Sequence, residues 1–231
     1  MIKPGALKSI REKIEMARIR AGREGDPPVE IVAVTKAFPA GAIAAAYGAG
    51  LRTIGETRIQ DATEKFREVG ELPGLKRRLI GHLQSNKAGK AADCFDWIDS
   101  VDSVKLGRRL SSIAGTRGKA IPVLVQVNTA RDPAKFGFGP EQTEELLELL
   151  DLPGLKVGGL MTIGALTEDE AKIRRTFRDL RELRDLLNEQ LPAHDRLSEL
   201  SMGMTGDFEI AVEEGATMVR IGTALFGPRP S

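Results

Sequence analysis

Short apolar runs rich in β-branched residues recur along the chain and alternate with amphipathic segments. The runs span residues 30–36, 51–56, 77–83, 95–101, 121–128, 155–163, 197–203 and 217–222. Their lengths and composition are typical of strands that are buried on both faces of a parallel sheet. The segments between them show helical periodicity and mostly end at glycine or proline, which terminate helices. The pattern therefore predicts eight consecutive β-then-α units.

Eight such units in 231 residues predict the α/β fold class and, within it, a single (β/α)8 TIM barrel. An extra N-terminal helix is indicated by apolar residues at helical spacing, namely Leu7, Ile10, Ile14 and Ala17. No low-complexity linker divides the chain, so we expect one domain over residues 1–231. The alternative is an open doubly wound sheet, but no G-x-G-x-x-G motif follows the first strand.

Composition and charge exclude several classes of function. Lys and Arg total 34 against 33 Asp and Glu, a balance that gives no strong field for nucleic acid or an acidic membrane. No apolar run reaches the roughly 18 residues of a membrane span. The one cysteine, Cys94, permits no internal disulfide, as expected for a cytoplasmic protein. With two histidines and one cysteine there is little material for a zinc site, and we expect no metal.

Polar residues gather where the predicted strands end, which is where the active sites of such barrels lie. These ends carry Lys36, Glu56, His82, Asp102, Asn128, Met161, Ser201 and Arg220. After the last two strands, "SMGMTGD" (201–207) and "RIGTALFG" (220–227) combine glycines with Ser and Thr hydroxyls. Such loops suit a phosphate dianion, and TIM barrels often bind phosphate at this position. The alternative is that these glycines only form tight turns.

Lys36 ends the first apolar run, where a lysine can simply point to solvent. At the site face, a partly desolvated lysine has a lowered pKa and attacks an aldehyde as the free amine, which gives a Schiff base. A phosphate loop together with such a lysine indicates pyridoxal 5′-phosphate (PLP). Arg220 either forms a surface ion pair or faces the pyridine nitrogen of PLP. In the second case that nitrogen stays unprotonated, because arginine only donates hydrogen bonds.

Seven segments, in order along almost the whole chain, carry a family resemblance. They are "AVTKAFP" (33–39), "IGETRIQDA" (54–62), "IGHLQSNK" (80–87), "DSVDS" (99–103), "VQVN" (125–128), "GGLMTI" (158–163) and residues 200–227. The chain resembles the PLP homeostasis proteins, also called the proline synthetase co-transcribed homologue family, which are similar to the barrel domain of alanine racemase. The resemblance implies one (β/α)8 barrel that binds PLP and maintains vitamin B6 and amino-acid balance.

The resemblance also implies roles for eight residues. Lys36 matches the Schiff-base lysine, and Arg220 matches the arginine at the pyridine nitrogen. The matches to phosphate-binding positions are Ser201, Gly222 and Thr223, and the matches to positions near the cofactor or lining its pocket are His82, Asn128 and Met161.

The chain departs from the family pattern at two positions. The family usually has Gly-Glu-Asn after the second strand, where this chain has Thr57, so the contact made by that asparagine is in doubt here. The racemases have an arginine where Lys135 stands, and we assign Lys135 no cofactor contact.

Catalysis by a racemase requires a base on each face of a planar intermediate. Lys36 would serve one face. In the racemases the other base is a tyrosine from a second, all-β domain, which we do not expect here because the sequence runs only to Ser231. Tyr47 lies in the helix after the first strand, and His82 is the other candidate.

We therefore expect a PLP carrier without robust turnover, and a PLP-dependent amino-acid racemase is the alternative. A barrel that binds another phosphorylated metabolite, with Lys36 uninvolved, is a third hypothesis. The expected partners are PLP and apo-forms of PLP enzymes, with no nucleic acid and no membrane. We expect a monomer.

Overall fold

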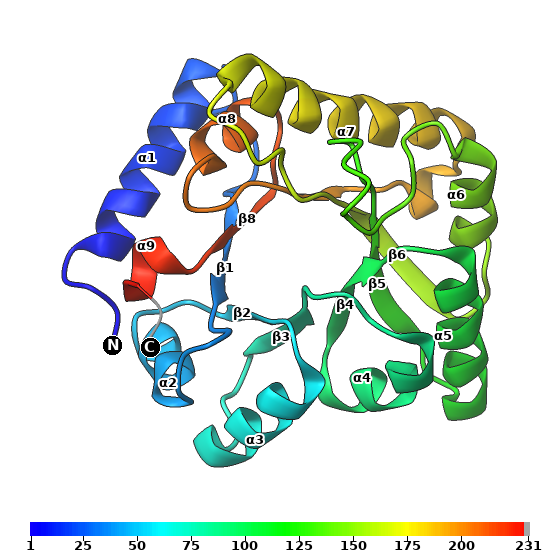
Figure 1. The fold of residues 1–231 in the computed structure, drawn as a ribbon, viewed down its shortest axis with the longest axis horizontal. Coiled ribbons are helices and arrows are strands. Elements are labelled where there is room, and N and C mark those ends of the chain that lie inside the picture. Colours follow the sequence, from blue (N-terminus) through cyan, green and yellow to red (C-terminus); the bar gives the residue numbers. More distant parts are fainter. Residues whose placement is uncertain (229–231) are drawn as a thin grey trace.

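The predicted (β/α)8 barrel is confirmed by a computed structural model, which describes residues 1–228. Eight parallel strands are neighbours in chain order, and pairing of the first with the last closes the barrel (Figure 1). The strands are β1 (Glu30–Val34), β2 (Thr53–Glu56), β3 (Lys76–Leu79), β4 (Trp97–Val101), β5 (Ile121–Gln126), β6 (Leu155–Met161), β7 (Glu199–Ser201) and β8 (Met218–Ile221). The single domain predicted over 1–231 remains a prediction, and its residues 229–231 lie outside the described part.

Helices surround the barrel (Figure 1). They are α1 (Ala6–Arg20), α2 (Gly41–Gly48), α3 (Ile59–Val69), α4 (Ala88–Cys94), α5 (Val104–Arg117), α6 (Thr143–Leu150), α7 (Glu170–Gln190), α8 (Phe208–Glu213) and α9 (Thr223–Phe226). Short 3-10 helices lie at Ser85–Lys87 and Ala193–Asp195. Within residues 1–228, no helix has both the length and the apolar character that a membrane crossing requires.

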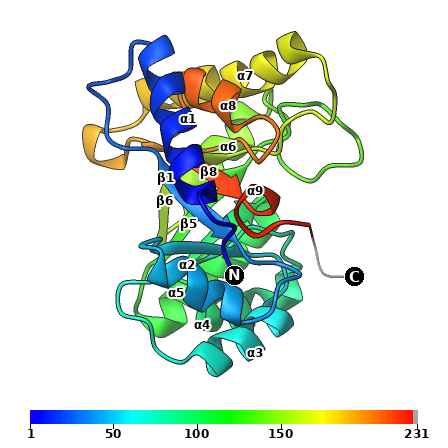
Figure 2. The ribbon, with the colours of Figure 1, turned by 90° about the vertical axis from the view of Figure 1, so that its left-hand side faces the viewer.

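The extra N-terminal helix α1 packs beside α8 and α9, as Figures 1 and 2 show. Three of its predicted apolar residues, Ile10, Ile14 and Ala17, are buried, and Leu7 is half-buried. The backbone N–H of Lys3 donates to the carbonyl of Leu225 at 2.8 Å. The first and last helices therefore cover the strands that close the barrel.

Local sequence explains where the longer helices begin and end. The Asp169 carboxylate caps α7 by accepting hydrogen bonds from the backbone N–H groups of Ala171 and Lys172. Ser103 caps α5 in the same way, and Gly118, with φ of 62°, ends that helix in the left-handed conformation. On α7, one face of the helix packs against the barrel, since Phe177, Leu180, Leu183 and Leu187 are buried.

Several strands end earlier than the apolar pattern predicts. β1 ends at Val34, β3 at Leu79 and β5 at Gln126. Lys36, His82 and Asn128 therefore lie two or three residues beyond the ladders, in the loops that follow. The physical reason is that the chain must turn at the end of each strand to reach the next helix, so the polar end of a run belongs to the turn.

Candidate functional site

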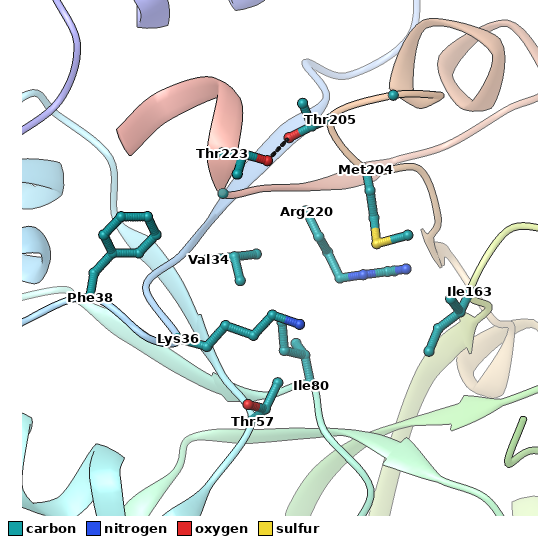
Figure 3. A pocket seen from close by; sticks show the side chains of 12 residues that line it. Val34, Lys36, Phe38, Thr57, Ile80, Ile163, Met204, Thr205, Arg220 and Thr223 are labelled. Atoms are coloured by element: carbon teal, nitrogen blue, oxygen red, sulfur yellow. Dashed lines mark hydrogen bonds between the residues drawn. The ribbon is translucent and has the colours of Figure 1, made fainter. Parts of the chain in front are cut away.

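A cavity of about 230 Å³ opens at the carboxyl end of the barrel. It is lined by Val34, Lys36, Phe38, Thr57, Ile80, Ile163, Met204, Thr205, Gly206, Arg220, Gly222 and Thr223 (Figure 3). These residues lie at or after the ends of β1, β2, β3, β6, β7 and β8. Four of the eight predicted site residues are among them, namely Lys36, Arg220, Gly222 and Thr223.

Lys36 lies in a tight turn just beyond β1. The backbone carbonyl of Thr35 accepts a hydrogen bond from the N–H of Phe38 at 3.0 Å, which closes the turn. The side chain of Lys36 is half-buried and points into the cavity (Figure 3). The turn thus brings a primary amine to the mouth of the barrel.

Two threonines lie across the cavity from Lys36 (Figure 3). The Thr223 hydroxyl donates to the Thr205 hydroxyl at 3.4 Å, and the N–H of Ala224 donates to the same Thr205 oxygen at 3.4 Å. Gly206 and Gly222 lie beside them without side chains of their own. This wall presents hydroxyl and backbone groups to the cavity, which is the kind of surface that binds an anion.

Arg220 comes from β8 and is only 5% exposed, yet it lines the cavity. Its guanidinium donates to the Ser201 carbonyl at 2.7 Å, the Ser201 hydroxyl at 2.9 Å and the Thr162 carbonyl at 2.7 Å. Burial lowers the pKa of Arg220 to about 10, against the opposing charges of Asp99 and Asp207. Arg220 is therefore still protonated at neutral pH, and its three acceptors are all uncharged.

Two predicted site residues lie behind this wall. Ser201, the last residue of β7, is fully buried, and its hydroxyl contacts Arg220. Met161, the last residue of β6, is also fully buried and is paired with Ser201 across the sheet. Neither side chain is among those that line the cavity. Ser201 reaches the cavity only through Arg220, which it helps to hold.

His82 lies to one side, at a second cavity of about 680 Å³. Its Nδ1 is 2.7 Å from the Asp102 carboxylate, and its ring stacks on that of Phe136 with centroids 3.7 Å apart. Thr57 lines both cavities and packs against Gly81, where a Cβ would lie 2.5 Å from the Thr57 carbonyl oxygen. Thr57 therefore separates His82 from the cavity that contains Lys36.

Asn128 organises the loop after β5. Its amide nitrogen donates to the carbonyls of Asp132 at 2.8 Å and Lys135 at 3.3 Å, and its oxygen accepts from the N–H of Asp132. Lys135 in turn donates to the Gly164 carbonyl at 2.6 Å. These contacts join two loops at the mouth of the barrel, and Asn128 does not line the Lys36 cavity.

Sequence reasoning missed several lining residues. Thr205 and Gly206 lie within "SMGMTGD", which was predicted to contact phosphate, whereas Ser201, the residue chosen in that segment, does not line this cavity. Phe38, Ile80 and Ile163 supply apolar walls, and the apolar runs offered no signal that distinguishes a wall from the core.

Comparisons with known proteins agree with this architecture. Residues 6–230 match the family described as "Alanine racemase, N-terminal domain". The chain is 40% identical to a pyridoxal phosphate homeostasis protein of Aquifex aeolicus, over 96% of each chain. It is 42% identical to a protein of the same name from Pseudomonas aeruginosa, over 96% of this chain and 94% of that one.

Solved structures show the same relationship. PipY of Synechococcus elongatus PCC7942, solved with PLP bound, superposes with a TM-score of 0.81 and 42% identity, over 93% of this chain and all of that one. An alanine racemase of Clostridium difficile 630 superposes with a TM-score of 0.76 at 18% identity. It covers 100% of this chain and 58% of the racemase, a likeness of fold alone. The chain belongs to the alanine racemase N-terminal domain family and, within it, to the pyridoxal phosphate homeostasis proteins.

Proposed function

We propose that this protein binds PLP in the Lys36 cavity, holds it as a Schiff base on Lys36, and serves PLP homeostasis without robust catalytic turnover. The observation that carries the proposal is the composition of one cavity. An amine, a protonated guanidinium and a wall of hydroxyls and glycines face the same space (Figure 3). The PLP-bound relative PipY, 42% identical to this chain, supports the choice of ligand.

The residues present fit the three functional groups of PLP. Lys36 suits the aldehyde, Thr205 and Thr223 suit the phosphate, and Arg220 suits the ring nitrogen. Lys36 would hold the aldehyde carbon through its neutral amine nitrogen, with the aldehyde oxygen released as water. Lys36 must therefore lose a proton before it reacts. Gly206 and Gly222, which have no side chains, would let a phosphate approach the backbone closely.

Bound PLP supplies an electron sink that stabilises carbanions, and its strength depends on protonation of the ring nitrogen. The guanidinium of Arg220 has no acceptor atom, so it can only donate hydrogen bonds. Ser201 and Thr162 hold the guanidinium from behind, so its orientation is fixed. Arg220 at the ring nitrogen would keep that nitrogen unprotonated, which favours storage of PLP over turnover.

The racemase alternative requires a second base opposite Lys36. Among the described residues that line the cavity, Lys36 and Arg220 are the two with ionisable nitrogen, and none is a His, Tyr, Cys, Asp or Glu. Tyr47 lies on α2, and its hydroxyl donates to the Pro73 carbonyl at 2.9 Å. His82 is held by Asp102 and Phe136 beside the other cavity. These positions favour a carrier.

As part of this proposal, the protein acts as a monomer in the cytoplasm and passes PLP to apo-forms of PLP enzymes. Ser201, His82, Asn128 and Met161 then act on the cofactor indirectly, through Arg220 or the loops at the mouth.

Borohydride reduction of the PLP-loaded protein, followed by peptide mass spectrometry, tests the proposal. We expect a phosphopyridoxyl adduct on Lys36. The adduct at this position is lost in Lys36→Ala and kept in Lys90→Ala, a matched control at the second cavity. Absence of the adduct from Lys36 in the wild-type protein would remove the assignment. Racemisation of alanine or other amino acids that disappears in Lys36→Ala would replace the carrier with a racemase.

A further inference from the structure

The turn that presents Lys36 has an unusual backbone. Lys36 and Ala37 are its two central residues, between Thr35 and Phe38. Ala37 has φ of 62°, whereas Lys36 is not among the residues with positive φ. A positive φ at the third position alone is the signature of a type II turn, which normally has glycine there. A side chain at this position is strained, and such strain persists only where the surroundings fix the backbone.

Two charged residues outside the cavity fix this turn. The Glu56 carboxylate accepts from the Thr35 hydroxyl at 2.7 Å and from the Lys65 ammonium at 2.8 Å. Lys65 also donates to the Thr35 carbonyl at 2.9 Å. Glu56 is 1% exposed, and the Lys65 side chain is 13% exposed. We call this ion pair the Glu56–Lys65 clamp.

The clamp forms hydrogen bonds with two groups of Thr35, the residue immediately before Lys36. The Thr35 carbonyl accepts from both the Phe38 N–H and Lys65, so the bond that closes the turn and the bond to the clamp share one oxygen. The Thr35 hydroxyl is bound to Glu56. Charge-assisted hydrogen bonds are shorter and stronger than neutral ones, and more so when they are buried. Thr35 thus has little freedom to move.

We infer that the Glu56–Lys65 clamp positions Lys36 for covalent capture of its ligand, by holding the strained turn in the conformation that directs the amine into the cavity. The inference rests on the proposed Schiff base. Thr35, Glu56 and Lys65 do not line the cavity, so their effect must pass through the turn. Reaction rates depend steeply on the orientation of the attacking group, and a small displacement of the backbone is enough to slow capture.

The test measures the rate at which the apo-protein forms the Schiff base when PLP is added, together with the pH dependence of its absorbance. Lys65→Met removes both hydrogen bonds and keeps most of the length of the side chain. Lys65→Arg keeps a cation that donates to two acceptors. Glu56→Gln keeps the shape of the acceptor and removes its charge. Leu110→Ala, in the buried face of α5, is the control for lost stability, because Leu110 is fully buried and away from the turn.

We expect Lys65→Met to slow Schiff-base formation on Lys36 by about tenfold or more, because both hydrogen bonds of Lys65 are lost and one charge-assisted bond alone accounts for about tenfold. Glu56→Gln should slow it less, and Lys65→Arg should restore most of the rate. The pH dependence of the Schiff-base absorbance should shift in Lys65→Met and stay unchanged in Leu110→Ala. Leu110→Ala should react at the wild-type rate even where it unfolds at a lower temperature.

Two results would overturn the inference while leaving the proposed function intact. One is a Lys65→Met protein that reacts at the wild-type rate with an unchanged pH profile. The other is a Leu110→Ala protein that is slowed as much as Lys65→Met, which would make the clamp a matter of stability alone. A wild-type protein that forms no adduct on Lys36 overturns the proposed function and the inference together.

Discussion

Two arginines are buried inside the same barrel, in opposite electrostatic settings. Arg78, on β3, is 1% exposed and is bound by two carboxylates, Asp99 at 3.0 Å and Glu199 at 2.7 Å. Its guanidinium also lies 4.4 Å from the centroid of the Trp97 ring. Arg220, on β8, is 5% exposed and has only uncharged acceptors.

Under the proposed function, the difference separates a structural arginine from one that contacts the ligand. The positive charge of Arg78 is balanced by the carboxylates of Asp99 and Glu199 within the barrel. Arg78 does not line the Lys36 cavity. Around Arg220 the positive charge is desolvated and left to act on whatever enters the cavity. Burial of an arginine therefore says little about its role, whereas the charge of its partners says a great deal.

The largest expected effect follows from removal of Arg78. Arg78→Met leaves the buried Asp99 and the partly exposed Glu199 without a cation, and we expect the free energy of unfolding to fall by about 3–5 kcal/mol. Burial raises the pKa of the Asp99 carboxyl against the lowering effect of Arg78. A raised carboxyl pKa contributes stability at low pH that is lost as pH rises through the folded-state value. Arg78→Met removes that lowering effect, so Asp99 takes up a proton more readily in the variant, and the loss of stability should be smaller at pH 5 than at pH 8.

Urea unfolding at the two pH values measures this effect. Arg77→Met is the matched control, because Arg77 is the next residue and its pair with Asp96 is partly exposed. It should cost about 0–1 kcal/mol at either pH. If Arg78→Met and Arg77→Met lost equal free energies of unfolding, the ion pairs of Arg78 inside the barrel would contribute no more to stability than the partly exposed pair of Arg77.

Arg220→Met should have a smaller effect on stability and a larger one on the ligand. No carboxylate loses a hydrogen-bond partner, so we expect a loss of about 1–3 kcal/mol from the carbonyls of Ser201 and Thr162. PLP binding, measured by equilibrium titration, should weaken about tenfold. Arg77→Met should bind PLP as the wild-type protein does. Unchanged PLP affinity in Arg220→Met would assign Arg220 to the same structural class as Arg78.

The smallest effect extends the comparison to the outer surface. Glu214 accepts from Arg174, Arg178 and Arg181, whose side chains are partly exposed. Burial alone would raise the pKa of Glu214, but these arginines outweigh it and hold that pKa below its ordinary value. A lowered pKa contributes stability above the unfolded-state value of about 4.3, and this stability is lost as pH falls through the folded-state value.

Glu214→Gln should therefore lower the free energy of unfolding by about 1 kcal/mol at pH 7, and the difference from wild type should vanish in acid. Thermal unfolding between pH 3 and pH 7 measures it. Glu189→Gln, on the exposed face near the end of α7, should leave the curve unchanged. A difference that persists unchanged at pH 3 would contradict the sign of this linkage.

Much of the fold was predictable because it depends on local patterns that repeat. Each strand has its own apolar run and each helix its own periodicity, so eight units could be counted without knowledge of their contacts. The positions of Lys36 and Arg220 followed from the rule that barrel sites lie at the carboxyl ends of strands.

The clamp and the Arg78 cluster could not be predicted, because both depend on side chains from separate elements. In the sequence, Lys65 is one of several charged residues on an amphipathic helix, and "KRRL" in β3 is the least apolar of the strands. Only closure of the barrel brings Arg78 against Asp99 and Glu199. No local spacing distinguishes a lysine that faces solvent from one that reaches Glu56.

The pairing of β1 with β8 has a consequence for how the protein is made. Val32 lies opposite Arg220 in this ladder, so the lysine turn and the threonine wall meet at the seam that closes the barrel. The two halves of the site are far apart in the sequence and are therefore translated at different times. While the ribosome is still extending the chain, Lys36 has already emerged and the wall that faces it does not exist. A ligand that contacts both the lysine turn and the threonine wall can bind only after the last strand has been synthesised. Binding of such a ligand therefore indicates that the barrel has closed.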